Sequence, residues 1–210
     1  KWIAYTKVTE TQFKRIFLYS IDQQKSFALT DGLSDASEPI FDKGGKYLFF
    51  FASTDAGPVI NWFDQSNDDL RSTYSIYLVT LQKETISPFA KESDEEKSKE
   101  ATDTAKNKKE PAPAAEKKPT AFSIDWEGIQ NRIIDLPLPA GNYGQLGMGK
   151  EGELLYIVYP PDFQGPGMML KYDIKKRKDE AVIEMDGYAL SADGNKMLYS
   201  KGPSWGISSA

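Results

Sequence analysis

The sequence predicts an all-β fold, a partial β-propeller of about four blades in which each blade is a four-stranded antiparallel sheet. One unit recurs, a short strand, a tight turn rich in Asp, Gly and Lys, and a strand of apolar and aromatic residues, at 40–50, 147–157 and 190–199. A shortened copy opens the chain at 1–5. Repeats with a period of about 40–45 residues are typical of propellers, in which each copy supplies one blade.

The first blade is predicted from two strands that a polar turn joins. Residues 15–21 alternate well enough to predict a half-buried strand. Residues 22–25 form the turn, and residues 26–30 pair back before Asp31 and Gly32 end the strand.

The second blade begins with a strand at 37–41. The Asp-Lys-Gly-Gly turn at 42–45 reverses the chain, and residues 46–52 return as the second strand. Residues 75–81, rich in β-branched and aromatic side chains, are predicted to form the third strand of this blade.

The second half of the chain has the same pattern. A hairpin is predicted from 168–174 and 181–185, and residues 205–209 begin a further strand. Because the first residue already lies in a strand and no signal peptide or initiator Met is present, we expect the chain to be part of a longer protein. The strands divide the chain into four blade-like units, at about 1–36, 37–90, 120–187 and 188–210.

Two inserts interrupt the repeat, at 54–74 and 91–119. The second insert has no aromatic residue and consists of Lys, Glu, Asp, Ala, Ser, Thr and Pro. Such a segment buries too little apolar surface to offset the entropy of ordering it, so we expect it to be disordered, with a frayed helix as the alternative.

The strand order between 82 and 136 has two solutions. Residues 121–126 and 130–136 are predicted to form a second hairpin, with no copy of the inner strand before it. Either 87–89 start an excursion and 133–136 form the true outer strand, or one blade carries an extra hairpin.

The residue types exclude several classes of function. The 210 residues include no Cys and no His, which excludes disulfides, thiolate or ordinary zinc sites, and Ser-His or Cys-His nucleophile pairs. A net charge of −5 argues against a nucleic-acid surface. No run approaches the roughly 20 apolar residues that span a bilayer. We expect no cofactor and no catalytic constellation in this chain.

The acidic residues of the turns are interpreted as structural. Asp-Gly turns tolerate the positive φ of a hairpin, and Asp42, Asp125, Asp173 and Asp193 lie at turns or strand ends of the repeat, so they are expected to form turns. Some propellers are glycosidases that use a pair of carboxylates, but nothing in the sequence pairs these four. The segment that begins at Asp64 resembles the start of a calcium loop, but it lacks the Gly and the Glu that set the geometry of such a loop.

The first insert holds the candidate contact residues. Trp62, Phe63 and Asp64 lie in a long loop, where aromatic residues either anchor the loop or form a contact surface. Anchoring is the simpler interpretation. If the loop lies over the mouth of a channel, these three residues are the natural contacts for a peptide or a neighbouring subunit.

Several motifs together resemble the propeller region of tricorn-type proteases. They are Leu-Thr-Asp-Gly-Leu-Ser-Asp-Ala-Ser-Glu-Pro-Ile-Phe-Asp at 29–42, Gly-Lys-Tyr-Leu-Phe-Phe at 45–50, Gln-Asn-Arg-Ile at 130–133, Leu-Pro-Leu-Pro-Ala at 136–140 and Leu-Ser-Ala-Asp-Gly-Asn-Lys at 190–196. The positions of the inserts match as well as the repeats, and the resemblance covers the chain apart from 91–119.

The resemblance implies a large serine peptidase with two propellers, a PDZ-like domain and a C-terminal catalytic region. This chain would be a non-catalytic part of one propeller, the second, that gates or channels peptides or assists assembly. Its implied partners are the remaining blades, the PDZ and catalytic domains, peptides and further copies of the parent protein, with no nucleic acid and no membrane span. The resemblance favours the periplasm, with the cytoplasm as the alternative.

Two other functions are compatible with the same repeats. The Leu-Thr-Asp-Gly ending at 29–32 also resembles TolB-type propellers, which would make the chain a periplasmic protein-binding scaffold. An accessory propeller of a prolyl-oligopeptidase-type enzyme is the third possibility, and it predicts a downstream hydrolase domain with a Gly-x-Ser-x-Gly elbow.

Overall fold

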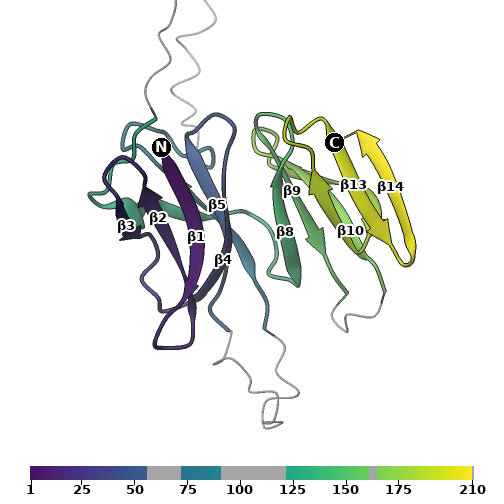
Figure 1. Ribbon diagram of the computed structural model, residues 1–210, viewed down its shortest axis with the longest axis horizontal. Coiled ribbons are helices and arrows are strands. Elements are labelled where there is room, and N and C mark those ends of the chain that lie inside the picture. Colours follow the sequence, from purple (N-terminus) through teal and green to yellow (C-terminus); the bar gives the residue numbers. More distant parts are fainter. Residues whose placement is uncertain (56–71, 91–121, 161–164, 210) are drawn as a thin grey trace, which may run out of the picture.

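The computed structural model describes residues 1–55, 72–90, 122–160 and 165–209. Within these residues the chain forms four antiparallel sheets and one short 3-10 helix, η2 (Ile129–Arg132). The sheets follow one another in chain order across the molecule, from β1–β3 to β12–β14 (Figure 1). The predicted all-β, blade-like architecture is confirmed. No helix in the described part of the chain is long and apolar enough to cross a membrane.

Each sheet is a meander in which neighbouring strands are consecutive in the chain. The two middle sheets have four strands, whereas the first and the fourth have three within the described residues. The strands are β1 (Trp2–Val8), β2 (Lys14–Ser20) and β3 (Lys25–Ala28); β4 (Asp35–Phe41), β5 (Tyr47–Ser53), β6 (Ser75–Thr80) and β7 (Ile133–Asp135); β8 (Tyr143–Met148), β9 (Glu153–Val158), β10 (Gly167–Asp173) and β11 (Lys178–Met185); β12 (Gly187–Leu190), β13 (Lys196–Lys201) and β14 (Ser204–Ser209).

The strand β7 settles the order that the sequence left open. It pairs antiparallel with β6, with Val79 opposite Ile133 and Tyr77 opposite Asp135, so it is the outer strand of the second sheet. The second sheet therefore takes its fourth strand from residues that the sequence pattern had grouped with the third unit, at 120–187.

The expected strand at 121–126 is absent from the described residues 122–126, which have no regular structure. Arg132 explains why, because its guanidinium donates to the carbonyl oxygens of Thr80, Asp125 and Glu127. The backbone N–H of Asp125 also donates to the carbonyl of Leu81 at 2.9 Å. These bonds fold the segment against the end of β6 instead of letting it pair as a hairpin.

The core consists of three clusters, one at each junction between consecutive sheets. In β5, Leu48, Phe50 and Ala52 pack toward the first sheet, while Phe49 and Phe51 pack toward the third. Successive side chains of a strand point to opposite faces, so a strand that is buried on both faces reads as an apolar run. The apolar run at 48–52 is therefore a strand in the middle of a stack of sheets.

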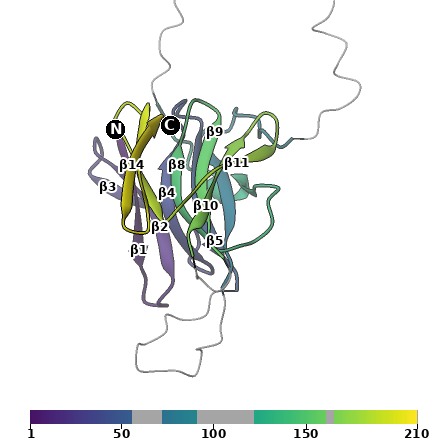
Figure 2. The ribbon, with the colours of Figure 1, turned by 90° about the vertical axis from the view of Figure 1, so that its right-hand side faces the viewer.

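The strand β9 repeats this arrangement one sheet further on. Leu154 and Tyr156 pack toward the second sheet, and Leu155 and Ile157 pack toward the fourth. Figure 2, viewed from the side of the fourth sheet, shows β14 in front of the stack. The first strands of three consecutive sheets lie against each other, β4 against β8 and β8 against β12. Inner strands that meet in this way are typical of a propeller.

Candidate functional site

The inner strands β4 and β8 carry a β-bulge at matching positions. The register with the neighbouring strand shifts between Ser37 and Ile40 in β4, and between Gly144 and Gly147 in β8. In each bulge a non-glycine residue has a positive φ, 52° at Glu38 and 54° at Gln145. A bulge redirects a side chain away from its regular position on the strand.

The redirected side chains hold the next inner strand. Glu38 Oε2 accepts a hydrogen bond of 3.0 Å from the backbone N–H of Leu146, and Gln145 Oε1 accepts one of 2.8 Å from the backbone N–H of Tyr188. The Tyr188 hydroxyl donates to the carbonyl oxygen of Gln145 at 2.7 Å. Burial is the main cause that raises the pKa of Tyr188, with the nearby charge of Glu38 second. We call these side-chain bonds between inner strands the bulge clasps.

The sequence confines the bulge clasps to two junctions within this chain. Pro39 follows Glu38 as Leu146 follows Gln145, but proline has no N–H to donate to a preceding strand. Gly187 precedes Tyr188 in β12 and has no side chain that could reach a following strand. A Cβ on Gly187 would lie 3.0 Å from Nε2 of Gln145, so the close approach of that amide favours glycine.

A groove of about 390 Å³ lies beside the bulge clasps, between β4, β8 and β12. Its lining combines one carboxylate, one amide and one phenol with apolar side chains. The lining residues are Glu38, Ile40, Gln145, Leu146, Gly147, Tyr188 and Leu190. Among the described residues, this lining offers hydrogen-bonding groups and apolar surface.

A second cavity, of about 240 Å³, lies between the first and second sheets. It is lined by Thr30, Asp31, Ser34, Phe50, Ala52, Tyr77, Gln130 and Ile133. The polar groups of Thr30 are already occupied, because its hydroxyl accepts from the N–H of Ile16 at 3.1 Å and its carbonyl accepts from Nε of Arg15. The cavity thus lies at the junction between two blades, and one of its polar residues already bonds to the first sheet.

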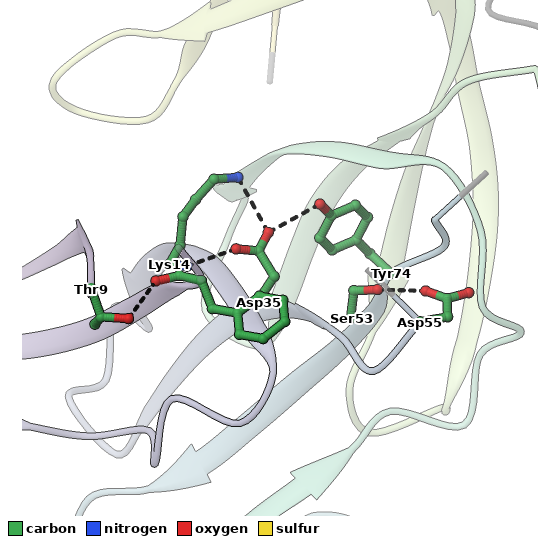
Figure 3. Close-up of polar contacts among 7 residues, drawn as sticks. Thr9, Lys14, Asp35, Ser53, Asp55 and Tyr74 are labelled. Atoms are coloured by element: carbon green, nitrogen blue, oxygen red, sulfur yellow. Dashed lines mark hydrogen bonds and ion pairs between the residues drawn. The ribbon is translucent and has the colours of Figure 1, made fainter. Parts of the chain in front are cut away.

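A buried acidic residue joins the first two sheets (Figure 3). Asp35 on β4 is only 6% exposed and forms an ion pair of 3.3 Å with Nζ of Lys14 on β2. The hydroxyl of Tyr74 donates to the same oxygen, Oδ2, at 3.2 Å, and Oδ1 accepts from the backbone N–H of Lys14 at 2.7 Å. Burial, and then the charge of Asp35, raises the pKa of Tyr74. A buried carboxylate that is paired in this way is a structural link between sheets.

The stem of the first insert is closed by Asp55. Its carboxylate accepts from the hydroxyls of Ser53 and Thr73 and from the backbone N–H of Thr73 (Figure 3 shows the bond to Ser53). The hydrogen bond from Ser53 is the main cause that lowers the pKa of Asp55. The candidate contacts Trp62, Phe63 and Asp64 lie outside the described residues, so their role stays a prediction.

The carboxylates of the turns bind backbone amides. Asp42 accepts from the N–H groups of Gly44, Lys46 and Tyr47, and burial still raises its pKa. Asp193 accepts from the Ser191 hydroxyl and the Asn195 N–H, and these bonds, the hydroxyl first, lower its pKa to about 2.

Asp173 and Asp125 likewise accept from backbone N–H groups, those of Lys175 and Lys83. All four carboxylates therefore stabilise turns or loops, as their place in the repeat indicates. Within the described ranges, no three acidic side chains lie close enough together to hold a metal ion.

Sequence reasoning did not find Glu38, Gln145 or Tyr188. Their role depends on two bulges, and a bulge adds one residue to a strand without a fixed composition. The only signals were Glu-Pro within a strand at 38–39 and two glycines around Gln-Leu at 144–147.

A family model described as the tricorn protease second beta propeller domain matches residues 1–209. Among curated relatives, the tricorn protease homolog 1 of Streptomyces coelicolor is 29% identical over 175 residues, which cover 76% of this chain and 15% of that protein. The putative tricorn protease homolog 2 of the same organism is 25% identical over 185 residues, which cover 81% of this chain and 15% of that protein. The tricorn protease homolog of Saccharolobus solfataricus is 26% identical over 213 residues, which cover 94% of this chain and 17% of that protein.

The chain thus spans about one sixth of the length of these relatives. Among solved structures, TolB from Acinetobacter baumannii superposes with a TM-score of 0.51 at 14% sequence identity, covering 99% of this chain and 37% of that one. This likeness shows the propeller fold alone. The match to the family model extends over the blades, the inserts and the inner strands, and by it the chain belongs to the family of the second β-propeller domain of tricorn proteases.

Proposed function

We propose that this chain is a non-catalytic propeller part of a tricorn-like serine peptidase, and that its inner strands line a passage through which peptides reach or leave the active site. The observation that carries the proposal is the groove of about 390 Å³ at the meeting of β4, β8 and β12. Propeller blades surround a central channel, so a groove shared by inner strands lies where a passing peptide makes contact.

The composition supports a binding role. The chain has no His and no Cys, so it cannot supply a Ser-His or Cys-His pair. The serine nucleophile and its base are proposed to come from another region of the peptidase. The purified chain should accordingly hydrolyse no peptide.

The open faces of the end sheets support the proposed partners. On the fourth sheet Trp205 and Ile207 are 71% and 72% exposed, and on the first sheet Ile3 is 50% exposed. Large apolar side chains on a flat sheet favour burial against another sheet. We propose that further blades of the peptidase cover these faces. The PDZ and catalytic domains, self-association and a periplasmic location are proposed from the family resemblance.

The passage can be tested by narrowing it in the protein at its full natural length. Leu146→Trp enlarges a side chain that lines the groove on the inner strand β8. We expect hydrolysis of peptides of about 20 residues to fall several-fold more than hydrolysis of a tetrapeptide, because the longer chain must thread the narrowed passage. The measurement is kcat/KM for both substrates.

The matched control is Ala181→Trp, which places the same ring at an exposed position on the outer strand β11. This control should change neither rate. Equal losses for long and short substrates in Leu146→Trp, at an unchanged melting temperature, would show that the groove does not lie on the path of peptides.

A further inference from the structure

The groove beside the bulge clasps has the chemistry of a cation-binding site with apolar walls. Ile40, Leu146 and Leu190 supply the walls, and Glu38 is the charged group of the lining. We propose that the groove binds the side chain of a lysine in a peptide, with the ammonium group at Glu38. This inference rests on the proposed function and names the class of peptide that the passage holds.

The carboxylate of Glu38 has capacity for a further partner. It is exposed, and its Oε2 accepts a hydrogen bond of 3.0 Å from the Leu146 N–H. Among the described residues no hydrogen bond reaches Oε1, and none of the ion pairs involves Glu38. An ionised carboxylate has about four acceptor sites, so Glu38, which lines the groove, can accept further hydrogen bonds.

The charge around the groove is negative. None of the described residues that line it is a Lys or Arg. The charge of Glu38 contributes, after burial, to the raised pKa of both Tyr159 and Tyr188, and the charge of Asp186 adds to the effect on Tyr159. A cation that enters the groove is therefore attracted by the negative potential of Glu38. A neutral side chain gains nothing from this potential, and an acidic one is repelled by it.

The apolar walls and the single open oxygen of Glu38 favour lysine over arginine. The methylene stem of a lysine packs along apolar walls while its ammonium reaches a polar group at the rim. Arginine binds carboxylates best through two parallel bonds, one to each oxygen. Because Oε2 of Glu38 is already shared with the Leu146 N–H, a compact ammonium on Oε1 suits the site better.

The test uses two probes that differ only in the charged group, Nα-acetyl-lysine amide and Nα-acetyl-norleucine amide. Binding to the protein at its full natural length is measured by saturation-transfer NMR at low ionic strength. We expect the lysine probe to bind about two- to fivefold more tightly than the norleucine probe, the range of an exposed ion pair. The preference should shrink as salt is added.

Glu38→Gln removes the charge and keeps the acceptor oxygen for Leu146, as Gln145 does for Tyr188. This variant should fold with an unchanged melting temperature and bind both probes equally. Glu84→Gln, a matched change at an exposed carboxylate in the turn after β6, should retain the full preference. Leu190→Ala should weaken both probes alike, because it removes part of the shared apolar wall.

The inference is overturned if the preference for lysine persists in Glu38→Gln, if the two probes bind the parent protein equally, or if neither binds. Failure here is distinguishable from failure of the proposed passage. A selective loss of long-peptide hydrolysis in Leu146→Trp would leave the passage standing without lysine recognition.

Discussion

Tyr156 and Tyr172 are both buried, on the neighbouring strands β9 and β10, yet only one of their hydroxyls is paired. The Tyr156 hydroxyl donates to Oδ2 of Asp179 at 3.2 Å, whereas the Tyr172 hydroxyl has no partner in the described part of the chain. Burial is the main cause that raises both pKa values, that of Tyr172 to about 12. Both side chains are therefore neutral at pH 7, and they differ in whether their hydroxyl forms a hydrogen bond.

This difference predicts opposite effects of the same substitution. Tyr172→Phe should leave the free energy of unfolding unchanged or raise it by about 1 kcal/mol, because it removes a desolvated hydroxyl that gains no bond. Tyr156→Phe should lower it by about 1–2 kcal/mol, because Asp179 loses its donor. Urea denaturation of the two variants measures both values. An equal loss in the two variants would mean that the Tyr172 hydroxyl has a partner.

At the scale of the element, the bulge clasps show how a local irregularity joins consecutive blades. The strand β8 both donates, through the Leu146 N–H, and accepts, through the Gln145 side chain. Within the described residues the four sheets share no backbone ladder with each other, so these hydrogen bonds add directional contacts to the apolar packing between the inner strands. The bulge clasps thereby define the position of each inner strand along the next one.

Gln145→Ala should therefore lower the free energy of unfolding by about 1 kcal/mol, because the Tyr188 N–H loses its acceptor. Hydrogen exchange at the Tyr188 amide should become faster in the same variant. Gln145→Glu keeps an acceptor oxygen in the position that Glu38 uses one blade earlier, and should protect the amide. Unchanged exchange in Gln145→Ala would show that the clasp does not hold the strand.

Burial and alternation made two of the predicted strands especially clear. The run at 48–52 and the alternation at 15–21 were sufficient for β5 and β2, because burial and period are written directly into the residue types. The strand β7 could be named only as one of two alternatives. Its three residues follow Arg132, which donates to the carbonyl oxygen of Thr80 at the end of β6 and so holds this part of the chain beside the second sheet.

The candidate site was less accessible for the same reason. A clasp joins residues 108 positions apart, Glu38 and Leu146, and its donor is a backbone group that no side-chain pattern marks. The segment around Trp62 is predicted as a contact because its aromatic residues stand out in an insert. The inner strands are not, because Glu-Pro and Gly-Gln within strands resemble ordinary irregularities.

At the scale of the whole molecule, the stack of sheets ends in two apolar faces. On the fourth sheet Leu198 lies opposite Ile207 in the pairing of β13 with β14, and both side chains are exposed. On the first sheet Ile3 is exposed, and the rings of Tyr5 and Phe17 stack 5.6 Å apart. The inner sheets bury both of their faces, so the end faces have the composition of a blade junction without a second sheet.

A paired substitution on the fourth sheet tests whether further blades cover its face. Trp205→Lys with Ile207→Lys should change the free energy of unfolding of the chain alone by no more than about 0.5 kcal/mol per site, because both side chains are already exposed. In the protein at its full natural length the same pair should destabilise by several kcal/mol, since two lysines would be placed in a packed junction. Melting temperatures of both forms give the comparison.

Leu33→Lys, at a residue that is 83% exposed in the loop between the first two sheets, is the control and should have little effect in either form. Equally small effects of the double variant in both forms would mean that the face is open in the complete protein, and that the ring is not continued at β14.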